Sequence, residues 1–157
     1  PNGKLSLMVT FNALSLPRFH LLLEKILEWR ARFNKPGQAD QRVIFDMPNL
    51  VEPTHLSTLM LTPDFHAYLD NCLEFMKKNV RGGDVFAFSE LEQKLLERVI
   101  MWIKEKHNLP EKQLQTDRAD FFAFVNEHDR RRGTNFLATF PEMHSFYNLC
   151  GEIHHKQ

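Results

Sequence analysis

Two short apolar runs stand out near the start of the chain. The run LSLMVTF at residues 5–11 includes the β-branched Val9 and Thr10, and its composition predicts a buried strand. The run RVIFD at residues 42–46 is apolar at three successive positions, which is typical of a strand covered on both faces in a parallel sheet. The two runs therefore predict a pair of strands in a parallel sheet.

A helical pattern separates the two runs. Ser15 and Pro17 signal a helix start, since proline suits the first helical turn, where no N–H donor is needed. Apolar residues then recur at spacings of three and four between Phe19 and Leu27, which predicts one buried helix face. The same pattern places the charged residues of this helix away from that face: Glu24, Lys25, Glu28 and Arg30.

Only helical patterns follow the second strand and a long loop at residues 47–61. Thr62 is the predicted N-cap of the first helix, and Pro63 is its first helical residue. Ser89, with Glu92 three residues later, predicts a capping box at the start of the next helix.

Two more helices are predicted in the last third of the chain. Asp117 is the predicted cap of a helix that runs to Arg132, with Gly133 in the C′ position, and Pro141 begins a last short helix. The order of elements is therefore strand, helix, strand, helix and then helices only. We expect an α/β fold with strand–helix units in residues 1–80 and a helical extension in residues 81–157, packed as one globular unit.

Two strands cannot by themselves bury both faces of a parallel sheet. We therefore expect further strands upstream of Pro1 and interpret the chain as a piece of a longer protein.

Composition narrows the functional classes. The 157 residues are 43% hydrophobic and 25% charged, which fits a globular domain and argues against wholesale disorder. Lys+Arg and Asp+Glu balance at 20 each, so no broad electrostatic attraction for nucleic acid is expected. No apolar run is long enough for a membrane span, and no signal peptide is evident. Cys72 and Cys150 are typical of reduced core thiols, and we expect a cytoplasmic protein.

Three segments resemble a known enzyme family. LMVTFNALSLPRFHLLLEKILEW resembles the late strand–Asn–helix unit of radical S-adenosylmethionine (SAM) enzymes, and RVIFDMPNLVEP resembles the next strand and its loop. DRADFFAFVNEHDRRRGTNFLATFPEMHSFYNLC is similar to the tail of the subgroup described as twitch-domain radical SAM proteins.

The resemblance implies a fold and a division of labour. The chain would be the C-terminal part of such an enzyme, a partial parallel (β/α) barrel fragment with two strand–helix units and a mostly helical tail. The CxxxCxxC motif of the family is absent, and two cysteines cannot supply three thiolates to a [4Fe–4S] cluster. The cluster that cleaves SAM to a 5′-deoxyadenosyl radical would then lie in a missing N-terminal part. This chain alone is expected to be inactive.

The resemblance also suggests which residues approach SAM. Asn12, together with Thr10, would lie near its methionyl or ribose portion. Independently, ligands of parallel α/β barrels sit at the carboxyl ends of the strands, which places both residues on the functional rim. An alternative for Asn12 is a turn residue that bonds its own backbone.

Three further residues are candidates on the substrate side, where the ligand is an unidentified small molecule or peptide. Asp46 and Asn49 follow the second strand, and His55 lies in the long loop. Asp46 would orient a substrate or cap a neighbouring helix. His55 would contact substrate or face solvent.

The cluster Arg130, Arg131 and Arg132 is the basis of a different functional class. Guanidinium groups suit phosphate and carboxylate, so the cluster would serve an α-rich binding or adaptor domain that holds an acidic partner or nucleic acid. Cations also favour a helix C-terminus, and Glu127 is placed to pair with Arg131. A purely structural role therefore stays open.

Metal ligation is not expected. His154 and His155, with His144 or His128, are nitrogen donors, but no HExxH or CxxC spacing accompanies them. A hydrolase or transferase that uses Asp46 and His55 is a third possibility without a supporting motif.

Overall fold

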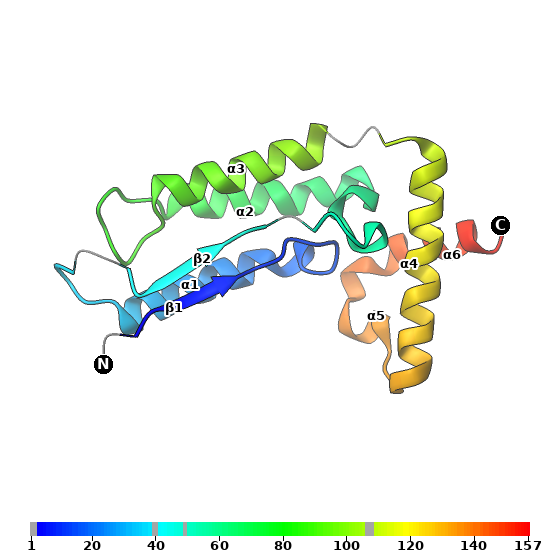
Figure 1. The fold of residues 1–157 in the computed structure, drawn as a ribbon, viewed down its shortest axis with the longest axis horizontal. Coiled ribbons are helices and arrows are strands. Elements are labelled where there is room, and N and C mark those ends of the chain that lie inside the picture. Colours follow the sequence, from blue (N-terminus) through cyan, green and yellow to red (C-terminus); the bar gives the residue numbers. More distant parts are fainter. Residues whose placement is uncertain (1–2, 39–40, 49, 106–108) are drawn as a thin grey trace.

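The computed structural model describes residues 3–38, 41–48, 50–105 and 109–157. Strands β1 (Leu5–Met8) and β2 (Val43–Asp46) pair in parallel and are joined through helix α1 (Phe19–Phe33). The remaining helices follow along the chain: α2 (His66–Lys78), α3 (Glu90–Glu105), α4 (Glu111–Arg132), α5 (Phe136–Thr139) and α6 (His144–His154). The fold is thus mostly helical with a small parallel sheet, in the order that the sequence predicts (Figure 1).

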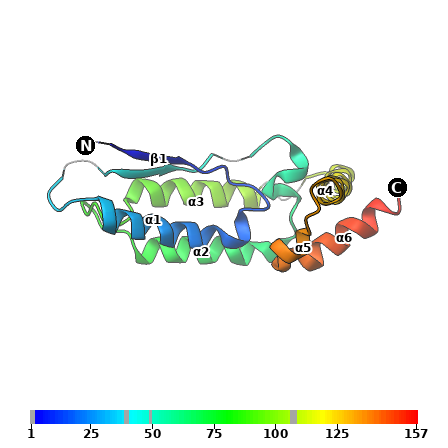
Figure 2. The same cartoon turned by 90° about the horizontal axis from the view of Figure 1, so that it is seen from below.

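The described helices cover only one face of the sheet. α1 and α3 lie next to the strands, and α2 lies on the side of these helices away from the sheet (Figure 2). On β2 the exposed fraction is 1% at Val43 and 7% at Phe45, but 41% at Ile44 between them. The prediction that this strand is covered on both faces is therefore wrong for the described part of the chain.

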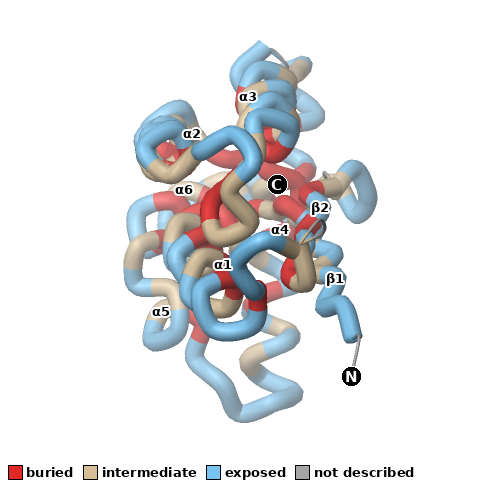
Figure 3. The backbone as a smooth tube through the Cα atoms, turned by 90° about the vertical axis from the view of Figure 1, so that its left-hand side faces the viewer, coloured by how far each residue is buried: buried red, intermediate tan, exposed pale blue. Residues whose placement is uncertain are grey.

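β1 is more exposed than its apolar sequence predicts. No position of this strand is buried, and only Leu7 is partly covered (Figure 3). Leu5 is 43% exposed and Met8 is 80% exposed, although both are apolar. The predicted buried strand therefore exists as a strand but not as a buried one, because no described element covers its outer side.

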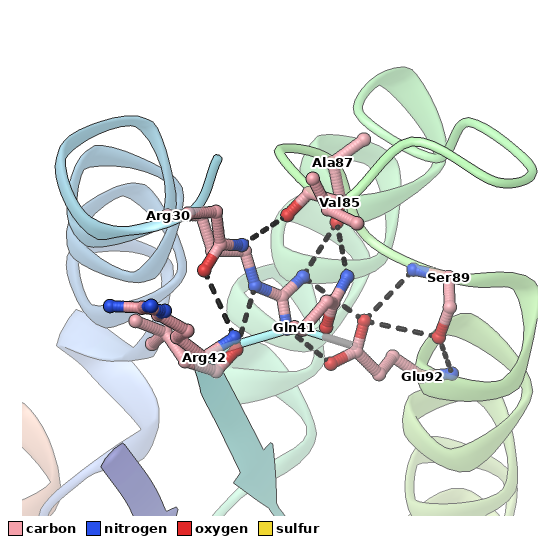
Figure 4. A network of polar contacts seen from close by, with 9 residues as sticks. Arg30, Gln41, Arg42, Val85, Ala87, Ser89 and Glu92 are labelled. Carbon is pink, nitrogen blue, oxygen red and sulfur yellow. Dashed lines mark hydrogen bonds and ion pairs between the residues drawn. The ribbon is translucent and has the colours of Figure 1, made fainter. Parts of the chain in front are cut away.

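Arg30 corrects the predicted pattern of α1. Its side chain is completely buried instead of facing solvent. The guanidinium donates through Nε to the Val43 carbonyl at 3.0 Å and through Nη1 to the Ala87 carbonyl at 2.6 Å, and it is paired with Glu92 (Figure 4). The ring of Phe88 lies 5.3 Å from the guanidinium carbon. Burial is tolerated because these partners satisfy the charge and its donors.

Most of the predicted helix starts and ends are confirmed. Glu92 accepts the Ser89 backbone N–H at 2.8 Å, and the Ser89 hydroxyl accepts the Glu92 N–H at 3.2 Å, which is the predicted capping box. Gly133 ends α4 with φ +64°, as its C′ position requires. Thr62 occupies the N-cap position of the short 3₁₀ turn Pro63–Phe65 that leads into α2, as predicted, but its side chain makes no capping hydrogen bond in the described structure.

Asp117 is not the cap of α4. The helix begins at Glu111, directly after Pro110, so Asp117 lies within it and is only 3% exposed. Its carboxylate accepts hydrogen bonds from the Thr54 hydroxyl at 2.7 Å and the Gln113 amide at 2.9 Å. The side chain therefore fixes the loop after β2 to α4 instead of starting the helix.

Aromatic side chains connect the two halves of the molecule. The ring of Phe65, before α2, lies 5.8 Å from that of Phe146 on α6, and Phe146 lies 5.6 Å from Phe121 on α4. These residues belong to one buried cluster that includes the inner positions of the sheet. None of the described helices is long and apolar enough to cross a membrane.

Candidate functional site

The chain segments beyond the two strands stay side by side. The Phe11 N–H donates to the Pro48 carbonyl at 2.8 Å, and the Leu50 N–H donates to the Phe11 carbonyl at 3.0 Å. The Ala13 N–H then donates to the Leu56 carbonyl at 2.9 Å. The residues that follow β1 are therefore held against those that follow β2, at the carboxyl ends of the strands where α/β proteins bind ligands.

Asn12 forms a local turn at this rim. Its Oδ1 accepts the backbone N–H groups of Leu14 at 2.9 Å and Ser15 at 3.0 Å. Its own N–H donates to the Ser15 hydroxyl at 3.0 Å, and its Nδ2 donates to the Thr10 carbonyl at 3.2 Å. This is the turn alternative predicted for Asn12. The second Nδ2 hydrogen has no partner among the described residues and is the group that remains for a ligand.

Asp46 is the last residue of β2 and is exposed. Its Oδ1 accepts the Met47 backbone N–H at 2.9 Å, and its side chain takes part in no ion pair within the described ranges. It neither caps a helix nor is buried, so its second oxygen is available at the rim. The other candidate of this segment, Asn49, lies outside the described residues.

A hollow of about 380 Å³ opens beside Asp46. Two elements line it, the end of β2 and one side of α3: Asp46, Met47, Pro48, Arg98, Val99 and Trp102. It therefore brings Asp46, Arg98 and Trp102 together at the carboxyl end of a parallel strand. Sequence reasoning identified Asp46 here but missed Arg98 and Trp102, because nothing in the helix pattern says which strand end α3 faces.

His55 lies with its ring against helix α4. Its ring is half-buried and lies 5.3 Å from the ring of Phe124 on α4. It is one residue from Leu56, whose carbonyl receives the Ala13 N–H, so the long loop joins the rim to α4. His55 is not among the residues that line the hollow beside Asp46.

The arginine cluster is largely neutralised within α4. Glu127 accepts two hydrogen bonds from Arg130, both at 2.7 Å, and one from Arg131 at 2.5 Å, as the sequence predicts for the second pair. These hydrogen bonds lower the pKa of Glu127 to about 2. Arg132 is exposed and has no ion pair among the described residues. With Arg131, Phe124, Glu127 and His128 it lines a hollow of about 280 Å³.

Asp129 stabilises the turn after this cluster. Its two carboxylate oxygens accept the Thr134 hydroxyl and the Phe136 backbone N–H, each at 2.7 Å. These bonds, the first above all, lower its pKa. The acidic residues near the cluster therefore have structural partners in α4 and in the turn that leads to α5.

The donor atoms do not assemble a metal centre in the described part of the chain. No three His, Cys, Asp or Glu side chains gather there in a ligating arrangement. Both cysteines are buried, and burial raises the pKa of Cys72 and of Cys150 to about 12. His154 and His155 stack around Phe122, at 5.4 and 5.6 Å from its ring.

No protein-family model, no curated protein and no solved structure matches this chain.

Proposed function

We propose that this chain is the C-terminal α/β segment of a radical SAM enzyme, in which it completes a partial parallel (β/α) barrel, helps to bind SAM and shapes the substrate cavity. The resemblance of three segments to that family supports this function. The observation that carries it is the difference between the two edges of the sheet.

Two backbone groups on the outer edge of β2 are occupied by side chains of its own unit. The Val43 carbonyl accepts Nε of Arg30 at 3.0 Å, and the Met47 N–H donates to the Asp46 carboxylate at 2.9 Å. Such bonds occupy the backbone groups that another strand would need, which is how native proteins protect an edge strand. β2 thus has the properties of the last strand of a sheet.

The outer edge of β1 is open. Leu5 and Val9 donate their N–H groups to β2, at 2.7 and 2.9 Å, so the alternate residues Ser6 and Met8 direct theirs to the other side. No described residue bonds to these groups. An open, apolar edge is a template for another strand, and parallel strands occur in larger sheets. These features support further barrel strands next to β1.

The residues at the rim fit SAM but not the cluster. Thr10 is exposed, and one Asn12 amide hydrogen is free for the carboxylate or ribose of SAM, while the turn keeps that amide in place. The chain has two cysteines, both buried with raised pKa values, and so does not supply the three thiolates of a [4Fe–4S] cluster. The role assigned to this chain is therefore to orient SAM and enclose the substrate.

The native polypeptide gives the first test. Its intact mass and N-terminal sequence, measured from the source cell, should reveal a chain longer than 18.6 kDa with CxxxCxxC upstream of residue 1. A native chain that starts near Pro1 and has no such motif would overturn the proposal.

The rim is tested by SAM binding to the native polypeptide. Asn12→Asp keeps the Oδ acceptor of the turn but removes the amide donor, so SAM affinity should fall while the fold is retained. Asn71→Asp changes charge in the same way at an exposed site on α2 and should bind SAM as the unmodified protein does. Equal affinities for both variants would remove Asn12 from the SAM site.

A binding domain that recognises an acidic partner is a second candidate, favoured by the exposed Arg132 beside the hollow on α4. Binding of poly-glutamate by the 157-residue chain should then weaken with salt and with Arg132→Gln. Because Glu127 holds Arg130, an Arg130→Gln variant should lose less affinity than Arg132→Gln. Absence of binding at low salt would exclude this candidate.

A further inference from the structure

The hollow between β2 and α3 has opposite charges that do not neutralise one another. Asp46 and Arg98 both line it, yet they form no ion pair within 4.0 Å in the described structure. Arg98 is exposed, and no hydrogen bond or ion pair within the described ranges occupies it. Its neighbour Glu97 is paired with Lys77 at 3.3 Å. The hollow therefore has a free cation on α3 and a carboxylate at the end of β2.

Trp102 gives the same hollow a flat apolar wall. The indole is half-buried and packs against the core, so its ring is held while one part of it stays accessible. Pro48, Met47 and Val99 complete the lining, whose exposed surface is somewhat more polar than apolar. Small-molecule sites typically enclose about 300–1,000 Å³ and use a few polar groups to fix the orientation of the ligand. The hollow measures about 380 Å³ and lies within that range.

We propose that this hollow binds a free aromatic α-amino acid in its zwitterionic form. The carboxylate of the ligand pairs with Arg98, its ammonium group pairs with Asp46, and its ring packs on Trp102. The assignment rests on the proposed function, because it takes this hollow as the substrate side of the cavity at the strand ends. Each of the three groups recognises a different part of one molecule, and an aromatic amino acid is the simplest molecule that has all three parts.

A neighbouring hollow on α3 is a weaker candidate for this ligand. It measures about 380 Å³ and shares Arg98 and Trp102, but every residue that lines it belongs to α3: Lys94, Glu97, Arg98, Met101, Trp102 and Glu105. One helix alone provides a shallow surface, whereas β2 and α3 together provide two walls and the carboxylate of Asp46. Substitutions at Asp46 and at Lys94 distinguish the two hollows, because Asp46 lines only the first and Lys94 only the second.

The binding test uses L-phenylalanine with the 157-residue chain. Trp29→Phe leaves Trp102 as the sole tryptophan, so a saturable change in its emission reports binding at this wall. Phenylacetate lacks the ammonium group, phenethylamine lacks the carboxylate, and L-leucine lacks the ring. Each should bind at least about tenfold more weakly than L-phenylalanine, since a hydrogen bond to a charged group or an aromatic contact is lost. Calorimetry on the unmodified chain gives the same comparison without the Trp29 substitution.

Variants identify the partners. Arg98→Gln and Asp46→Asn should each weaken L-phenylalanine binding at least about tenfold, and Arg98→Gln should leave phenethylamine binding unchanged. Lys94→Gln removes an exposed cation one turn away on α3 and should have little effect. No saturable binding, equal binding of the four probes, or equal effects of Arg98→Gln and Lys94→Gln would overturn the assignment. A SAM-binding native protein that does not bind L-phenylalanine overturns this inference alone, whereas a native chain without the upstream motif overturns the proposed function.

Discussion

Arg30 and Glu92 form a buried ion pair, with Nη2 of the arginine 2.6 Å from Oε1 of the glutamate. A second bond, from Nη1 to Oε2, measures 3.2 Å. The same carboxylate accepts the backbone N–H and the hydroxyl of Ser89 at the start of α3. The pair therefore joins α1, which lies against the sheet, to the first turn of α3.

Breaking this pair should destabilise the fold severely. Glu92→Gln leaves the Arg30 charge buried without its counterion, which typically costs about 3–5 kcal/mol of unfolding free energy. Chemical denaturation followed by circular dichroism measures the loss. Glu28→Gln on the exposed side of α1 is the matched control and should change the unfolding free energy by about 0.5 kcal/mol or less.

Removing both charges should be less harmful than the sum of the single changes. Arg30→Met with Glu92→Leu leaves no buried charge, so the double variant should recover part of the stability that each single variant loses. Strictly additive losses would mean that the two side chains act independently, in contradiction to the bidentate geometry.

The burial of Arg30 shows where sequence reasoning ends. Helical periodicity counts arginine as a solvent-facing residue, and its partner Glu92 lies 62 positions further along the chain. The capping box between Ser89 and the same Glu92 was predictable, because both of its bonds are local. The cap predicted at Asp117 was wrong for the opposite reason. Its local sequence resembles a helix start, but the helix already begins at Glu111 and the carboxylate bonds to Thr54 in a distant loop.

The residues of the candidate site also differ in whether local sequence predicts them. Asp46 was predicted because the end of a parallel strand is a known position for ligands. Arg98 and Trp102 were not, because their approach to Asp46 depends on how α3 packs beside β2. Strand and helix positions follow from local periodicity, whereas a site built from two elements follows from packing.

The two cysteines should be unreactive in the folded protein. Burial raises the pKa of Cys72 and of Cys150 to about 12, so almost no thiolate is present near neutral pH. A maleimide reagent at about pH 7 should label both thiols slowly in native buffer and rapidly in denaturant. Mass spectrometry counts the labels, and fast labelling of either thiol in native buffer would contradict its buried position.

Glu127 should make stability depend on pH in the acidic range. Its pKa is about 2 in the folded chain, held down by hydrogen bonds from Arg130 and Arg131, whereas an unfolded glutamate titrates near its ordinary value of about 4.3. A lowered folded pKa contributes stability that is complete above the unfolded value and is lost as pH falls toward the folded one. The difference in denaturation midpoint between the unmodified chain and Glu127→Gln should therefore shrink from about pH 5 to pH 2.

The Glu127 ion pairs are exposed to solvent, which limits their contribution to stability and makes it sensitive to salt. The arginine side chains are 71% and 69% exposed, so about 1 M salt should reduce the difference between the two proteins. Glu24→Gln, at an exposed carboxylate of α1 with no ion pair in the described structure, should show no such pH-dependent difference. A Glu127→Gln difference that is constant across this pH range would exclude the proposed titration.

Gly151 should be required for the close approach of α4 and α6. Alanine normally stabilises a helix interior by about 1 kcal/mol relative to glycine. A Cβ at Gly151, however, would lie 2.9 Å from Cε2 of Phe122. That ring has little room to move, because Tyr147, His154 and His155 stack around it at 4.9, 5.4 and 5.6 Å. Gly151→Ala should therefore lower the thermal midpoint despite its better helix propensity.

A second substitution distinguishes the clash from other effects. Phe122→Leu removes the ring atoms that the new Cβ would meet, so Gly151→Ala should be less destabilising in that background than in the unmodified chain. Gly82→Ala has open space around its Cβ and an ordinary φ, and it should leave the midpoint nearly unchanged. If Gly151→Ala instead raised the midpoint, the ring would have moved aside and the helices would not be in the tight contact described here.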